Sequence, residues 1–333
     1  MERRVQRLTD GTRHHFFGYY DKCPWDATGR YVLALAADFM DRPPGPDDTA
    51  TVGMVDLARG NQWIPLAETQ AWNWQQGAML QWLPSRPDDL IIYNARSDDS
   101  FVSVIRDVHG GSTRMLLRPV YAVSHDGRSA LSLSFARIHH CRPGYGYAGL
   151  PDPWSEDPAP EEDGIWRMDL VTGECRLTVS LARVAAIDHQ PNMDGARHWF
   201  NHVQFNTADS RFVFLHRWRR DGMMWSTRMF TACPDCSDLY CVADHEMVSH
   251  FDWRDEAHIL AWARQHGEGD LFYLFADKSQ DREVVGRGVL NADGHCSYSP
   301  DRKWILTDSY PDTESKRSLI LFRPADGRCT VLG

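Results

Sequence analysis

Residues 294–307 read GHCSYSPDRKWILT, and this stretch decides the fold. A short segment carries a histidine followed three residues later by an aromatic residue, and then a polar turn leads into an apolar β-type run. The same order occurs in residues 201–215, NHVQFNTADSRFVFL, and in residues 249–261, SHFDWRDEAHILA. The histidines are separated by 48 and 45 residues, which indicates an internal repeat of the kind found in solenoids and propellers.

Three earlier stretches, residues 22–37, 79–94 and 120–135, follow the same plan without the histidine. Each unit continues with further alternating or apolar runs, such as TVGMVDL at residues 51–57. Such runs indicate strands, and periods of 40–50 residues with about four strands each predict a β-propeller. The expected fold is all-β, a single domain over residues 1–333 with four-stranded antiparallel blades. Six units can be read directly, and residues 2–9 are expected to supply a strand that closes the ring.

Composition narrows the class of protein. The net charge of −10 argues against a nucleic-acid binder, which usually presents a basic face. The first residues lack the apolar core of a signal peptide, and no run approaches the ~18 apolar residues of a membrane span. We therefore expect a cytoplasmic protein without a membrane partner, its eight cysteines being reduced thiols. Cys233 and Cys236 are expected to flank a hairpin turn.

The third unit contains a long insertion, roughly residues 137–163, with a Tyr- and Gly-rich part and then a Pro- and acid-rich part. Loops of this length are either solvated surface segments or lids over sites. The sequence leaves both open.

The repeated histidines are the strongest indication of function. The innermost strand of a propeller blade lines the central channel, and the corresponding positions in the other units are Lys22, Met79 and Val120. Side chains two apart share a strand face, which adds Gln204, Asp252 and Ser297 as neighbours of the three histidines. Imidazole with amide or carboxylate oxygen suits a divalent ion such as Zn, Mn, Fe or Ni. The alternative is a structural histidine that bonds between strands, as in WD-type repeats.

Two other groups of residues suit binding of a sugar acid. HHFFGYYDK at residues 14–22 and WNWQQG at residues 72–77 each precede an innermost strand. Their aromatic faces could stack on sugar rings, or they could pack between blades. Arginines after two apolar strands could bind carboxylates bidentately, or could form salt bridges within one face. The predicted substrate contacts are Trp72, Gln76, Trp82, Tyr145 and Arg264.

The segments His202–Trp218 and Gly294–Asp301 resemble the repeats of oligogalacturonate lyases, most clearly over residues 197–312. The resemblance implies seven blades, and on that basis we expect seven here. It also implies cytoplasmic β-elimination of short polygalacturonate, with manganese or a similar ion held by three histidines and a glutamine. Carried over, the ligands are His202, His250, His295 and Gln204. Ser297 departs from the family pattern, in which two ligand histidines lie one residue apart.

This resemblance predicts a lyase for an acidic oligosaccharide that requires a divalent metal, with Mn favoured over Zn, Ca, Fe or Ni. The C5 proton must pass to a base, for which His15 is preferred over His14 and His216. Arg217 or Arg264 would assist in neutralising the carboxylate, and Tyr20 would serve as the acid.

Two other classes remain open. A glycoside hydrolase would need two facing carboxylates, for which Asp21 and Asp252 are candidates. A non-catalytic propeller that binds a glycan or a protein would need no metal. The sequence does not indicate the oligomeric state.

Overall fold

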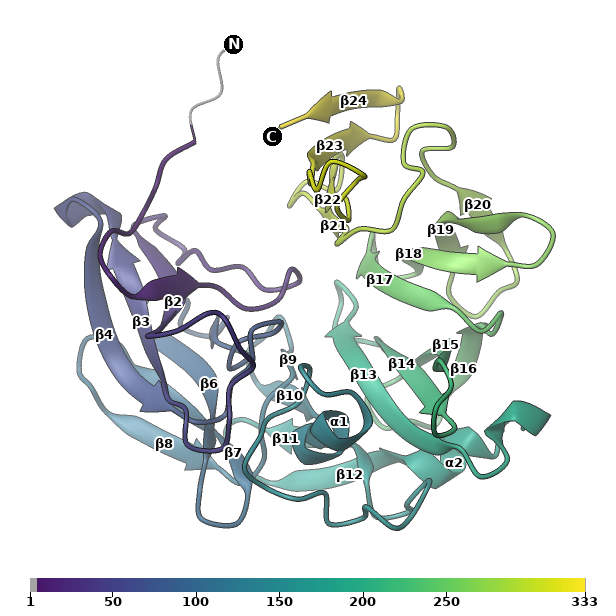
Figure 1. The fold of residues 1–333 in the computed structure, drawn as a ribbon, viewed down its shortest axis with the longest axis horizontal. Coiled ribbons are helices and arrows are strands. Elements are labelled where there is room, and N and C mark those ends of the chain that lie inside the picture. Colours follow the sequence, from purple (N-terminus) through teal and green to yellow (C-terminus); the bar gives the residue numbers. More distant parts are fainter. Residues whose placement is uncertain (1–4, 333) are drawn as a thin grey trace. The chain divides into compact units, whose positions relative to one another are not determined.

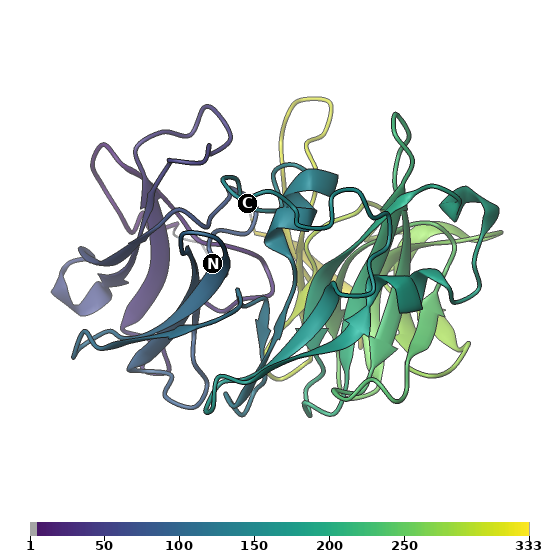
Figure 2. The same cartoon turned by 90° about the horizontal axis from the view of Figure 1, so that it is seen from below.

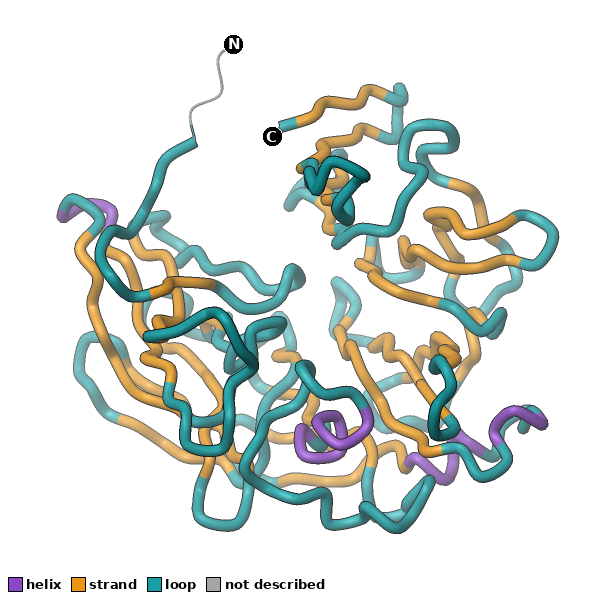
Figure 3. Tube along the Cα trace, viewed as in Figure 1, coloured by secondary structure: helices purple, strands orange, loops and turns teal. Residues whose placement is uncertain are grey.

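The computed structural model describes residues 5–332, which fall into two compact units with their boundary between Phe200 and Asn201. Six four-stranded antiparallel sheets make up these residues (Figure 1). Helical segments are few and short, as the purple parts of the trace show (Figure 3). No helix in the described part of the chain is long and apolar enough to cross a bilayer.

The N-terminal unit contains three sheets, formed by β1–β4, β5–β8 and β9–β12. Its strands are β1 (His14–Phe16), β2 (Tyr31–Ala37), β3 (Ala50–Asp56), β4 (Gln62–Thr69), β5 (Gln81–Trp82), β6 (Leu90–Arg96), β7 (Phe101–Asp107), β8 (Thr113–Leu116), β9 (Ala122–Val123), β10 (Ser129–Ser132), β11 (Gly164–Asp169) and β12 (Cys175–Ser180). Its helices are α1 (Phe135–Cys141) and α2 (Leu181–Ala185), with 3₁₀ turns at Leu57–Arg59 and Pro191–Met193.

The remaining three sheets are formed by β13–β16, β17–β20 and β21–β24 and belong to the C-terminal unit, although β13 begins just before the boundary. Their strands are β13 (Arg197–Phe205), β14 (Phe212–Arg219), β15 (Ser226–Ala232), β16 (Tyr240–Ala243), β17 (Val248–Trp253), β18 (His258–Gln265), β19 (Gly269–Ala276), β20 (Arg282–Val284), β21 (Ser297–Tyr298), β22 (Ile305–Asp308), β23 (Leu319–Arg323) and β24 (Arg328–Val331). Figure 2 shows the same sheets in a second view.

The expectation of seven blades is wrong, because the fold is a six-bladed β-propeller. Every sheet takes four consecutive strands, and together they use all the β-type runs of the described chain. Of the predicted closing strand, residues 5–9 form no strand, and residues 2–4 lie outside the described residues. The seventh blade came from the family resemblance and had no run of its own in this sequence.

The first strand also differs from the prediction. We expected residues 14–22 to precede the first innermost strand, but β1 is the His14–Phe16 segment, which pairs with the end of β2. Trp25 makes only an isolated bridge to Val32. The chain leaves the sheet in between, and Gly18 lies so close to the carbonyl of Gln76 that an added Cβ would be 2.6 Å from its oxygen. The HHF segment is therefore a strand, where a loop was expected.

Apolar side chains of successive sheets pack into separate clusters. In the N-terminal unit, Leu33, Leu35 and Val52 pack with Trp72 and Trp82. In the C-terminal unit, alternate residues of β18 face opposite sides: Ile259 and Ala261 join one cluster, and Leu260 and Trp262 another. Full burial of such side chains contributes about 1.5–3 kcal/mol each. Alternate side chains of such a strand point to opposite faces of its sheet, so one strand contributes apolar contacts to the clusters on both faces.

The insertion is tied to its own unit by one arginine. Helix α1 begins after Ser134, whose hydroxyl caps the backbone N–H of Arg137. The Arg137 side chain is buried and donates to the carbonyls of His198, Trp154, Asp157 and Pro158 and to the carboxylate of Asp152. These bonds hold residues 152–158 against the end of the N-terminal unit. A lid role for other parts of the insertion stays a prediction.

Candidate functional site

The three repeat histidines gather in the C-terminal unit. His202 lies on β13 and His250 on β17, both almost fully buried, while His295 precedes β21 and is partly exposed. Their ring centroids are 6.2 Å apart for His202 and His250, and 4.0 Å apart for His250 and His295. Equivalent positions in consecutive repeats thus place three imidazoles side by side.

Two carboxylates orient two of these rings. The His250 Nδ1 lies 3.0 Å from Asp293 Oδ1, and the His295 Nδ1 lies 3.0 Å from both oxygens of Asp308. A carboxylate accepts hydrogen bonds, so each Nδ1 carries the proton and each Nε2 carries the lone pair. Metal-binding histidines in proteins are commonly held in this way.

The pKa shifts of His250 and Asp308 favour a neutral imidazole at His250 and an ionised carboxylate at Asp308. Burial lowers the pKa of His250, against the opposing effect of Asp293. Burial alone would raise the pKa of Asp308, but hydrogen bonds from the ring and backbone of His295 outweigh it and lower the pKa. Neutral imidazole is the form that ligates metals.

Gln204 adds an amide oxygen on the same strand as His202. Its Nε2 donates to Asp252 Oδ1 at 2.8 Å, and the other oxygen of Asp252 accepts from the backbone N–H of Tyr298 at 2.7 Å. The Gln204 Oε1 is buried, and no donor among residues 5–332 reaches it. A buried carbonyl oxygen without a donor is costly, and it is an available ligand for a cation.

The backbone at His202 is left-handed, with φ of 50°. Such a conformation is unusual for residues other than glycine and is often found at functional sites. Met79, at the equivalent position of the second blade, has the same φ of 50°. The left-handed backbone is thus shared with a position that carries no histidine, so it is not by itself a mark of a ligand position.

The donor types fit a divalent ion: three imidazoles and an amide oxygen, with carboxylates behind them. The arrangement is not that of a formed metal site, because no three His, Cys, Asp or Glu side chains in the described residues converge closely enough to hold an ion. The residues therefore supply suitable ligands in one neighbourhood without enclosing a common point.

A buried cationic pair lies on the next two strands of the same sheet. Arg217 on β14 is 3% exposed, and its Nε and Nη1 have no hydrogen-bond partner in the part of the chain that the structure describes. Arg228 on β15 lies opposite His216 on β14, and its Nη2 donates to the His216 Nδ1 at 3.2 Å. His216 therefore carries its proton on Nε2, which makes it a poor base through that atom. Arg217 retains two donors for an anionic group.

The predicted base lies in the N-terminal unit. His15 on β1 packs edge-on against Trp63, with ring centroids 4.7 Å apart. Burial lowers the pKa of His15, as does the charge of Arg13. His14 is the preceding, partly buried residue of the strand, and Tyr20 packs against Tyr19 at 4.6 Å. These features suit a histidine that is neutral at pH 7, and the catalytic roles stay predictions.

The predicted substrate contacts of the N-terminal unit are mostly in its interior. Trp72 and Trp82 belong to the core cluster, and their indole nitrogens donate to the carbonyls of Asp48 and Pro24. Gln76 is fully buried and donates to the Tyr121 hydroxyl. These observations support the packing role that the sequence left open.

Two other predicted contacts are nearer the surface. Tyr145 is partly buried, and the guanidinium of Arg142 lies 3.7 Å from its ring centroid. Arg264 forms a bidentate salt bridge with Asp270 on β19, at 2.8 and 2.9 Å. The guanidinium of Arg264 is thus paired within its own sheet, which is the salt-bridge alternative that the sequence left open.

Sequence reasoning missed the carboxylates that orient the histidines. Asp293 lies two residues before His295, and Asp308 ends β22, the second strand after it. Their acidic side chains were visible in the sequence near a repeat histidine, but the sequence did not show that they bond to the imidazoles. None of the eight cysteines, all within the described residues, forms a disulfide, and the backbone N–H of Cys236 donates to the carbonyl of Cys233 in a turn, as expected.

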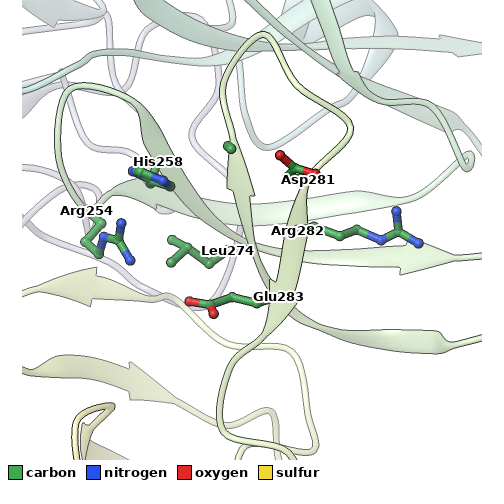
Figure 4. Close-up of a pocket in the computed structure, with 7 residues that line it drawn as sticks. Arg254, His258, Leu274, Asp281, Arg282 and Glu283 are labelled. Atoms are coloured by element: carbon green, nitrogen blue, oxygen red, sulfur yellow. The ribbon is translucent and has the colours of Figure 1, made fainter.

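A separate cavity of about 370 Å³ lies elsewhere in the C-terminal unit (Figure 4). Its wall includes Arg254, His258, Leu274 and Glu283, and the Arg282 side chain extends away from these four. Arg254 and His258 both bind Asp255, at 2.9 and 2.8 Å. The basic groups of this cavity are therefore already paired, and it contains none of the clustered histidines.

Comparison with known proteins places the fold. An oligogalacturonate lyase in complex with manganese superposes with a TM-score of 0.66 at 17% identity, covering 97% of this chain and 79% of that one. The beta-propeller domain of the Trilobed protease from Pyrococcus furiosus gives 0.58 at 11%, covering 97% and 86%. An acylaminoacyl peptidase from Pyrococcus horikoshii gives 0.54 at 11%, covering 91% and 44%.

No protein-family model matches the chain, and no curated protein matches its sequence. The structural likeness shows a β-propeller fold, which the lyase and the two peptidases also have. Function must therefore be argued from the side chains, because one propeller scaffold serves many activities.

Proposed function

We propose that this protein is a metal-dependent lyase that cleaves uronate-containing oligosaccharides by β-elimination. The observation that carries the proposal is the gathering of His202, His250 and His295 with the undonated Oε1 of Gln204. The manganese complex of the structurally similar lyase supports the choice of metal and substrate class. A divalent ion held by these ligands would supply a Lewis acid for the substrate's C6 carboxylate.

The residues of this chain would do three things. His250 and His295 present Nε2 lone pairs because Asp293 and Asp308 hold their Nδ1 protons. Gln204 presents its oxygen because its Nε2 donates a hydrogen bond to Asp252, which turns the Oε1 the other way. These contacts preorganise the donors, so that little side-chain entropy remains to be lost on binding.

Arg217 would bind the anionic part of the substrate. Its Nε and Nη1 are buried without acceptors, and a guanidinium fork matches a carboxylate. Neutralising that carboxylate acidifies the C5 proton, which is the first requirement of the elimination. Arg264 is less suited, because Asp270 already occupies both arms of its fork.

The elimination itself moves one proton and breaks one bond. A base takes the C5 proton, the electron pair forms the C4–C5 double bond, and the C4–oxygen bond breaks with protonation of the leaving oxygen. His15 remains our choice of base, because its lowered pKa keeps the imidazole neutral at pH 7. Tyr20 remains the proposed acid.

The test is a spectroscopic assay with a panel of uronate oligomers, oligogalacturonides first, in the presence of Mn²⁺. The lyase reading predicts growth of the ultraviolet absorption of the conjugated unsaturated uronate, and loss of that growth on chelation. New reducing ends without the chromophore would instead identify a hydrolase. No cleavage of any oligomer would leave a binding protein.

The structure gives the hydrolase reading no specific support. Asp252 accepts hydrogen bonds from Gln204 and from the backbone of Tyr298, and Asp21 is ion-paired with Lys22. Both carboxylates are thus engaged in positioning contacts.

A further inference from the structure

A second cavity, of about 400 Å³, lies in the N-terminal unit and shares no residue with the histidine cluster. Residues of β7, the β10–α1 connection, β11 and the insertion line it, and its wall is mainly apolar. The aromatic rings that it exposes are those of Phe101, Phe135, Trp154 and Trp166. Cavities of this size and character are typical of small-molecule sites.

One cation lines this cavity, Arg118. Its guanidinium carbon lies 3.3 Å from the ring centroid of Trp166, as in a cation–π stack. No acceptor or carboxylate among residues 5–332 bonds to this half-buried guanidinium. Burial lowers the pKa of Arg118, while the charges of Asp163 and Cys175 act on it through space in the opposite direction. A guanidinium stays protonated in proteins, so this is a partly desolvated cation without a bonded anion.

The other polar groups of the wall offer few partners for hydroxyls. The Ser134 hydroxyl caps α1, and the Ser100 hydroxyl bonds to Ser97. The indole N–H of Trp166 is buried and has no acceptor in the described residues. The unmet groups are thus donors, and the remaining wall is aromatic and aliphatic. Asp99 is the one carboxylate of the lining and is exposed to solvent.

We propose that this cavity binds a small apolar carboxylate, an arylalkanoate in chemical class, with its carboxyl group on Arg118 and its apolar body among the aromatic side chains. The charge of the ligand follows from the unbonded guanidinium. Its apolar body follows from the wall, because a sugar acid would bring several hydroxyls to a mainly aromatic and aliphatic surface that offers few partners for them.

Calorimetric titration of the full chain with 3-phenylpropionate tests this directly, with 3-phenylpropionamide as the neutral match. We expect the acid to bind and the amide to bind at least about tenfold more weakly, as loss of a charged hydrogen bond implies. Arg118→Gln should weaken the acid by a similar factor, and Arg118→Lys by less. Arg176→Gln changes an exposed arginine on β12, the strand that pairs with the Trp166 strand β11, and should leave binding unchanged.

The ligand pair needs no substitution, so a variant that fails to fold does not remove the test. Equal binding of acid and amide, or no heat from either at millimolar concentration, would overturn the proposal. The proposal would also be overturned if galacturonate bound, phenylpropionate did not, and Arg118→Gln lost the galacturonate binding, because the cavity would then be a sugar-acid site. The outcome is independent of the lyase assay, which concerns other residues.

Discussion

The amide of Gln204 is fixed by the carboxylate of Asp252, to which its Nε2 donates at 2.8 Å. A carboxylate can only accept, so the amide oxygen must face the opposite way, and that oxygen finds no donor among the described residues. Two residues from neighbouring blades thus set the direction of one potential metal ligand.

Asp252→Asn tests this relationship. The variant keeps an oxygen for the backbone of Tyr298 but no longer forces the Gln204 amide into one orientation. We expect Mn²⁺ affinity, measured by calorimetry, to fall about 10- to 100-fold, as when other supports of metal ligands are lost. Asp281→Asn, at an exposed position of the same unit, should not change it. Unaltered affinity in Asp252→Asn would remove Gln204 from the ligand set.

His250→Ala removes a donor outright. The chain should lose most of its bound metal, measured by elemental analysis after dialysis, because one of three imidazoles is gone. His258→Ala is the matched control, since that histidine lies on β18, outside the histidine cluster, and its Nδ1 bonds to Asp255. A His250→Ala protein with its full metal content would show that the ion binds elsewhere.

Arg217→Met should separate stability from activity. A buried guanidinium with two nitrogens lacking acceptors is costly, so a methionine of similar length should stabilise the fold by about 1–2 kcal/mol in urea denaturation. The same change should abolish most of the ultraviolet signal on uronates. Arg282→Met, an exposed arginine paired with Glu268, should alter neither beyond about 0.5 kcal/mol. A destabilised Arg217→Met would indicate that Arg217 is a structural residue.

Asp163 gives a prediction in pH. It is 1% exposed, and burial raises its pKa from 3.8 to about 6. The folded state therefore binds this proton more tightly than the unfolded state, so stability is lost as pH rises from about 4 through 6. Asp163→Asn lacks the ionisable group and should match the native protein near pH 4. It should exceed the native protein by about 1–3 kcal/mol near pH 8.

Thermal or urea unfolding at the two pH values measures the difference. Asp98→Asn, at an exposed position of the same unit, should show no pH-dependent gain. A gain for Asp163→Asn that is the same at both pH values would contradict a raised pKa, because it would not depend on ionisation.

The sequence predicted the blades well because their signal is local. Alternating runs such as residues 212–219 and 258–265 become strands, and the turns between them contain the expected polar residues. The shared register of His202, His250 and His295 was also visible, because equivalent positions in neighbouring repeats lie side by side. The blade count was wrong because it rested on the family resemblance and not on a seventh run.

What could not be predicted depends on contacts between distant segments. Asp293 and Asp308 orient histidines through hydrogen bonds that no spacing rule specifies. Trp72 and Trp82 resemble exposed sugar-binding residues in the sequence, yet both fill the core. The unbonded state of Arg118 is visible only when its surroundings are known. Sequence patterns therefore do not show which side chains are buried or which polar side chains bond to one another.

Anomalous scattering from crystals grown with Mn²⁺ tests the central claim most directly. The account predicts one strong peak bounded by His202, His250, His295 and the Oε1 of Gln204, absent from His250→Ala crystals. A peak at other residues, or no peak at saturating Mn²⁺, would contradict it.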